Sequence, residues 1–200
     1  ISKDVIMNIT VPQQLSTMWV SLDASSARAK RRVKVWLEYL LWLAYLKACH
    51  PQISDAETQV YQRVAVFSDV TLINTGVTAT QAQQYIQQWF NIYEHAQTQP
   101  VVLPAALMLI LAEKGKSLEW EPADNGRMVL ANFKDLQKEW DKSDAFLPFS
   151  LTDKEWSKKH QDWQFILQEQ DATALLKAAI EQFAHDLYQP IDQYQTTAEE

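Results

Sequence analysis

The scarcity of glycine is the sequence feature that most limits what this chain can fold into, because only three glycines occur among 200 residues. Tight hairpins, glycine-rich phosphate loops and all-β sandwiches rely on glycine at their turns. These architectures are therefore disfavoured. Hydrophobic residues make up 47% of the chain and charged residues 22%, a balance typical of a folded globular protein. The sequence predicts an all-α fold.

Apolar residues recur along most of the chain with the spacing of amphipathic helices. The expected fold is a single-domain bundle of about six or seven helices around Trp42. The predicted helices cover roughly residues 27–49, 55–75, 78–97, 104–115, 125–141, a segment that begins at Thr152, and 172–188.

Several segments fit this scheme less well. Residues 64–73 are rich in β-branched side chains, so a strand competes with the preferred helix there. Short strands near residues 4–11 are left open. We expect residues 1–24 to form a lead segment, 116–126 a loop and 194–200 a tail. The alternative to one domain over 1–200 is a split near residues 115–126.

The net charge of −7 argues against a surface built entirely for nucleic acid. Basic residues nevertheless gather at two places. The first group surrounds the start of the helix over 27–49 and contains Arg28, Lys30, Arg31, Arg32 and Lys34. The second is a stripe on the helix over 125–141, formed by Arg127, Lys134, Lys138 and Lys142. Both patterns suit phosphate binding, although solvated helix faces produce such patterns more often.

Large aromatic side chains provide the candidate partner-binding residues. Most of the eight tryptophans fall on stripes that helix packing would bury. Trp120 lies in the expected loop, and Phe165 projects away from the apolar stripe of its own helix. Exposed aromatics often anchor protein interfaces, so Phe165 and Trp120 are predicted to contact a protein partner or a second copy of the chain.

Reactive chemistry has little support in the sequence. The single cysteine, Cys49, allows no internal disulfide, and the four histidines are scattered, so we predict no catalytic residue, no metal site and no cofactor. His160 and Asp69 are the only suggestive members of an enzyme site assembled from distant residues. Such a site would require the two side chains to lie within hydrogen-bonding distance.

No segment is long enough to cross a membrane, because the uncharged run Tyr39–Leu46 falls well short of the roughly 20 residues required. The first 24 residues also lack the pattern of a secretory leader. We therefore expect a cytoplasmic protein. The predicted function is a non-enzymatic helical interaction module, a subunit or adaptor of a larger cytosolic assembly. The alternative is a nucleic-acid-associated protein that uses a local basic patch.

Overall fold

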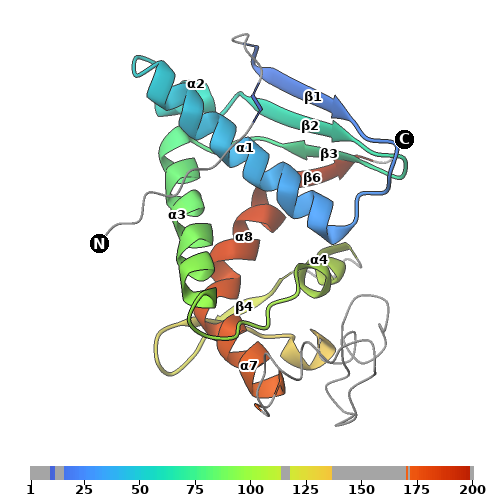
Figure 1. Cartoon of the computed structure of the whole chain (residues 1–200), viewed down its shortest axis with the longest axis vertical. Helices are drawn as coiled ribbons and strands as arrows, with labels where there is room; N and C mark the ends of the chain where they lie inside the picture. The colour runs from blue at the N-terminus through green and yellow to red at the C-terminus, as the bar shows by residue number, and fades with distance from the viewer. Residues whose placement is uncertain (1–9, 12–15, 114–117, 137–169, 171, 199–200) are drawn as a thin grey trace. The chain divides into compact units, whose positions relative to one another are not determined.

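The computed structural model describes residues 10–11, 16–113, 118–136, 170 and 172–198. The chain is mixed α/β (Figure 1), so the prediction of an all-α bundle is wrong. Strands β1 (Met18–Leu22), β2 (Gln62–Val66), β3 (Thr71–Asn74) and β6 (Gln195–Ala198) form a sheet in the order β1-β2-β3-β6. Strands β4 (Trp120–Pro122) and β5 (Met128–Leu130) form a separate hairpin.

The helices match several of the predicted spans. They are α1 (Ala29–Cys49), α2 (Asp55–Thr58), α3 (Ala79–Ala96), α4 (Ala105–Glu113), α7 (Ala172–Ala179), the π-helical segment η2 (Ile180–Ala184) and α8 (His185–Tyr194). The predictions over 27–49 and 78–97 are confirmed by α1 and α3. The predicted helix that begins at Thr152 lies outside the described residues.

The described chain divides into two compact units. Unit 1 contains residues 1–27, 34–86 and 194–200, and unit 2 contains residues 28–33 and 87–193. Residues 115–126, the place of the alternative domain split, lie within unit 2.

The sheet of unit 1 is organised around α1. Strands β1 and β2 pair in parallel, a connection that requires a crossover, and α1 lies in that crossover. Figure 1 shows α1 lying along one face of the sheet. Apolar side chains of α1 are fully buried, and they include Trp36, Leu40, Trp42 and Leu43. The ring of Trp42 meets that of Trp19 on β1 with centroids 5.8 Å apart. Trp42 is fully buried, but its helix packs on a sheet and not at the centre of the predicted helical bundle.

Residues 62–74 form a β-hairpin where the sequence favoured one long helix. Along β2 the side chains alternate between half-buried and buried, which is the period of a strand and not of a helix. Strands β2 and β3 are antiparallel, and Ser68 and Asp69 lie at the turn between Phe67 and Val70. The β-branched residues of this segment therefore decided its structure.

The predicted tail is also wrong, because residues 195–198 form the fourth strand of the sheet. β6 pairs antiparallel with β3, and Gln195 donates a side-chain hydrogen bond to Asn74 at 3.0 Å. Just before β6, the ring of Tyr194 stacks on Trp36 with centroids 6.4 Å apart. The C-terminal segment is thus part of the sheet of unit 1.

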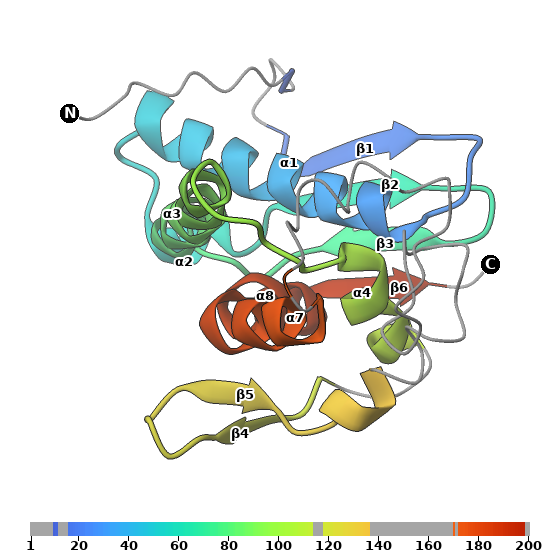
Figure 2. The same ribbon diagram turned by 60° about the horizontal axis from the view of Figure 1, so that its bottom comes forward.

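Unit 2 contains the β4–β5 hairpin, drawn in yellow in Figure 2. It replaces the loop expected over 116–126 and the beginning of the helix expected over 125–141. The turn is tight because Gly126 has φ of +76° and donates to the carbonyl of Ala123 at 2.8 Å. Residues 133–136 are helical, and the rest of that predicted helix lies beyond the described part.

Candidate functional site

The start of α1 carries the first predicted basic group. Arg28, Lys30 and Lys34 are exposed, whereas Arg31 is half-buried. Arg32 is buried, so the five charges do not all project into solvent. Burial raises the pKa of the Asp192 carboxyl, and the positive charge of Arg32 acts in the opposite direction. Arg32 therefore interacts electrostatically with Asp192 inside unit 2.

The polarity of α1 strengthens the positive potential at its start. The N-terminal end of a helix carries a partial positive charge from its free N–H groups. The first turn of α1 contains no acidic residue. Exposed Arg28 and Lys30 therefore add their charges to the helix dipole, which is an arrangement that attracts anions.

The second basic group does not form the predicted stripe on one helix. Arg127 follows the turn of the β4–β5 hairpin, where its N–H donates to the side-chain oxygen of Asn125 at 3.0 Å. Lys134 is exposed in the helical residues 133–136. Lys138 and Lys142 lie outside the described residues. The hairpin thus separates Arg127 from the helix on which the sequence placed it.

The two predicted aromatic anchors have different outcomes. Trp120 belongs to strand β4 and is half-buried, so it is not the exposed loop residue that the sequence suggested. Its ring meets the edge of His185 with centroids 5.1 Å apart. Phe165 lies outside the described residues. Their predicted roles in partner binding stay predictions.

Asp69 has a structural role at the β2–β3 turn. Its carboxylate accepts a hydrogen bond from the backbone N–H of Ala27 at 2.8 Å. The backbone N–H of Ser68 donates to the carbonyl of Ser25 at 3.1 Å. Together these contacts connect the turn to the segment before α1. His160 lies outside the described residues, so the proposed pairing with Asp69 stays a prediction.

A buried ion pair that sequence reasoning missed lies between the sheet and α1. The guanidinium of Arg63 on β2 donates to the Glu38 carboxylate at 2.7 Å and to the Ser21 hydroxyl at 2.8 Å. It also lies over the ring of Trp19, with 4.3 Å to the centroid. A single arginine inside a short strand gives no distinctive sequence signal. Because its donors are used within unit 1, we interpret this cluster as structural.

Strand β1 exposes a row of apolar side chains. Met18, Val20 and Leu22 are 48%, 52% and 81% exposed, and all three point away from the face that carries α1. In the register of the sheet, Val20 lies beside Val64, which lies beside Ile73. The apolar row therefore continues across half-buried residues of the neighbouring strands.

The backbone of β1 is also open along one edge. Gln62 N–H donates to the Thr17 carbonyl, and Asp23 N–H donates to the Val66 carbonyl. The backbone groups of Thr17 and Asp23 therefore face β2. Backbone groups of alternate residues point to opposite edges of a strand. Those of Val20 and Leu22 therefore point outward. Among the strands that the structure describes, only β2 pairs with β1.

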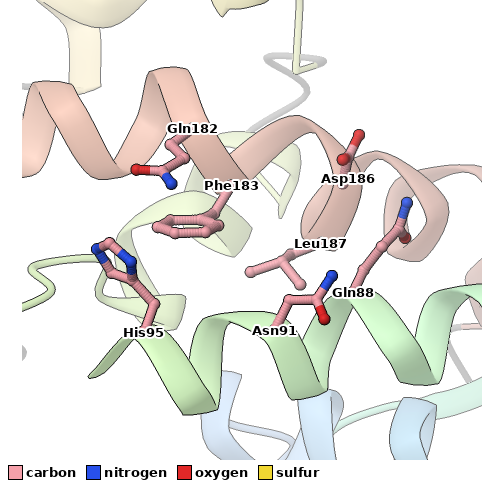
Figure 3. A pocket seen from close by; sticks show the side chains of 7 residues that line it. All are labelled: Gln88, Asn91, His95, Gln182, Phe183, Asp186 and Leu187. Carbon is pink, nitrogen blue, oxygen red and sulfur yellow. The ribbon is translucent and has the colours of Figure 1, made fainter. Parts of the chain in front are cut away.

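Unit 2 contains a pocket of about 310 Å³ between α3 and the helical segment formed by η2 and α8. Gln88, Asn91 and His95 line it from α3, and Gln182, Phe183, Asp186 and Leu187 line it from the other side. Figure 3 shows His95 and Phe183 facing each other from the two elements. Their ring centroids are 5.1 Å apart. The pocket thus combines an aromatic wall with several side-chain amides.

The described ranges offer no arrangement for a metal ion or a membrane span. Within them, no group of three or more histidine, cysteine, aspartate or glutamate side chains is placed to hold a metal ion. None of the helices in this part of the chain has the length and hydropathy needed to cross a bilayer.

Comparison with known proteins identifies one family. A family model described as RecC C-terminal domain matches residues 6–116. The match includes β1, α1, the β2–β3 hairpin and α3. No curated protein and no solved structure matches the chain. Because the matched segment covers more than half of the 200 residues, the chain belongs to the RecC C-terminal domain family, a DNA-repair-associated family.

Proposed function

We propose that this protein is a non-enzymatic subunit of a DNA-repair assembly and that strand β1 is its docking site for another protein. The observation that carries the proposal is the exposed row of Met18, Val20 and Leu22 on a strand with an open edge. Native proteins usually protect such an edge, because it readily pairs with another chain. Membership of the RecC C-terminal domain family supports a place in a multi-subunit complex that binds DNA.

The proposed occupant is an extended, uncharged segment of a partner subunit, added as a further strand next to β1. Strand addition uses the backbone groups of the edge for affinity and alternate side chains for specificity. The exposed side chains of β1, those of Met18, Val20 and Leu22, are all apolar. Their neighbours on β2 carry no charge; these are Gln62, Val64 and Val66. A charged partner segment would lose hydration on this surface without gaining an ion pair.

Site-specific photocrosslinking in the native assembly tests this proposal. A photoreactive amino acid at Leu22 is expected to crosslink to an alternating apolar segment of one partner subunit, identified by mass spectrometry. The same amino acid at Tyr45, which is exposed on α1, is the matched control and should not give that crosslink. Leu22→Lys should abolish the association while leaving the circular dichroism spectrum unchanged.

Two results would contradict the docking site. Crosslinks from Leu22 to Leu22 of a second copy, together with a dimeric mass in light scattering, would indicate self-association in place of a partner strand. Retention of the partner by the Leu22→Lys protein would remove β1 from the interface.

A second candidate function is binding to nucleic-acid phosphates at the start of α1. The exposed charges of Arg28 and Lys30, at the start of a helix whose first turn contains no acidic residue, favour this function specifically. The prediction concerns these exposed side chains and excludes Arg32, which is buried. A cationic site of this kind is compatible with an overall acidic chain because it is local.

The test measures binding to a labelled DNA duplex as a function of salt. For two phosphate contacts, Arg28→Gln with Lys30→Gln should lower the slope of log K against log salt by about 1.8. Lys47→Gln with Lys177→Gln removes two charges elsewhere and is the matched control. Equal slopes for both double variants would exclude the start of α1 as the phosphate site.

A further inference from the structure

The lining of the pocket of unit 2 contains three side-chain amides, which both donate and accept hydrogen bonds, and one carboxylate, which only accepts. The side-chain oxygen of Gln88 is buried and accepts no hydrogen bond within the described residues. Asp186 is the only acidic residue in the lining, which contains no lysine or arginine. Its carboxylate contacts the Nδ1 of His185 at 3.0 Å. A ligand with several donors would satisfy this arrangement better than an anion would.

One wall of the pocket is apolar and is formed by Phe183 and Leu187. Phe183 is half-buried and presents its ring beside His95, while Leu187 is buried behind it. Phe183 belongs to the π-helical segment η2, a rare distortion that frequently accompanies functional sites. A bound group would therefore contact a flat aromatic surface on one side and oxygen acceptors on the other (Figure 3).

We propose that this pocket binds the guanidinium group of an arginine side chain from a protein partner. A guanidinium is planar, carries five N–H donors and stacks on aromatic rings. It could contact the ring of Phe183 and donate to the carboxylate of Asp186, and a rotation of the Gln88 side chain would let its buried oxygen accept from the remaining donors. These are the three chemical features that the pocket combines.

Other ligand classes fit less well. Phosphates and carboxylates would meet the negative charge of Asp186 with no lysine or arginine in the lining. A lysine ammonium would pair with Asp186, but it has no planar surface to stack on Phe183. A nucleobase could stack there, although the phosphate attached to it would approach the same carboxylate.

This inference rests on the proposed function, because an arginine side chain would come from a partner subunit. It uses a pocket in unit 2, whereas the proposed docking strand β1 belongs to unit 1. A small arginine probe tests the pocket without the partner. Failure of the probe to bind would overturn the pocket proposal and leave the crosslinking result at Leu22 unaffected.

The experiment is a nuclear magnetic resonance titration of the full chain with N-acetyl-arginine-methylamide. We expect a dissociation constant on the order of 1 mM, as befits a single side chain. Shifts should be largest for the side-chain amide of Gln88 and the ring of Phe183. The corresponding lysine and citrulline derivatives should bind more weakly, because the first lacks the plane and the second lacks the charge.

Two variants assign the binding to the pocket. Asp186→Asn should weaken binding of the arginine probe by about tenfold, since it removes a charge-assisted hydrogen bond. Asp124→Asn makes the same change at an exposed position of the β4–β5 turn and should leave the affinity unchanged. Asp186 is exposed, so Asp186→Asn is expected to fold normally.

Three outcomes would overturn the proposal. The first is equal binding of arginine, lysine and citrulline derivatives. The second is an affinity for the arginine probe that Asp186→Asn does not change. The third is tighter binding of deoxyadenosine monophosphate than of the arginine probe at the same resonances, which would make the pocket a nucleobase site.

Discussion

The buried ion pair between Arg63 and Glu38 predicts an unequal response to the loss of either partner. The side chain of Arg63 is 4% exposed, whereas that of Glu38 is 20% exposed. If Arg63 loses its counter-ion, its charge remains enclosed. If Glu38 loses its counter-ion, its carboxylate can still reach water. We therefore expect Glu38→Gln to destabilise the protein more than Arg63→Met does.

The magnitude follows from the exposure of the two side chains. Breaking a fully buried pair costs about 3–5 kcal/mol when one charge is left unpaired. For Glu38→Gln we expect about 3 kcal/mol, because the introduced amide can still accept a hydrogen bond but carries no charge. For Arg63→Met we expect about 1 kcal/mol, because methionine fills the same apolar space beside Trp19 and the remaining carboxylate is solvated.

Urea unfolding followed by tryptophan fluorescence measures these differences. Thermal unfolding is a second measurement of the same difference. In a chain of this length, a loss of about 3 kcal/mol in the free energy of unfolding lowers the melting temperature by roughly 6–12 °C. The double variant Glu38→Gln with Arg63→Met should be no less stable than Glu38→Gln alone, because it also removes the buried Arg63 charge that would otherwise be unpaired. A larger loss of stability for Arg63→Met than for Glu38→Gln would refute the argument from burial.

Two further predictions concern other buried groups of the fold. Burial raises the pKa of Tyr39 and of Tyr188 above its ordinary value, and it raises the pKa of Tyr85 to about 12. The unfolded chain releases these protons near pH 10, so the stabilisation is complete below pH 10 and is lost as the pH rises toward 12. Absorbance at 295 nm should therefore rise together with unfolding, and full ionisation of the native protein at pH 10 would contradict this. Gly76 has φ of +87°, and a methyl group there would lie 3.5 Å from the Tyr194 ring, an ordinary contact. Gly76→Ala should accordingly cost about 1–2 kcal/mol of unfolding free energy from backbone strain alone, and a change below 0.5 kcal/mol, roughly the noise of surface substitutions, would exclude strain at this position.

The sequence predicted the long helices but not the strands, and the reason is segment length. α1 extends over 21 residues with apolar side chains on most faces, so its period is repeated several times. β2 and β3 contain five and four residues, too few to distinguish their period from that of a helix. Their turn at Ser68 and Asp69 contains no glycine to mark it.

β6 was missed for a different reason. Its residues, Gln195–Ala198, are mostly polar and are exposed after the first position. A polar edge strand pairs through its backbone, which leaves no hydrophobic pattern in the sequence. Its place is fixed by the pairing with β3 and by the contact of Gln195 with Asn74, two features that depend on residues more than a hundred positions away.

The candidate sites could also be predicted only where they depend on residues close together in the sequence. The local charge pattern pointed to Arg28 and Lys30, and both are exposed, while their role in nucleic-acid binding stays a prediction. Arg32 is buried by tertiary packing that the sequence could not reveal. The apolar row on β1 and the pocket beside Phe183 both depend on the arrangement of distant segments.

The position of β6 constrains the order in which the molecule can be assembled on the ribosome. Strands β1, β2 and β3 are synthesised early, but the neighbour of β3 emerges only with residues 195–198. Until then the nascent sheet has a second open edge, at β3, in addition to the one at β1. Contacts of such long sequence separation form slowly. Unit 1 is therefore completed only after unit 2 has been translated.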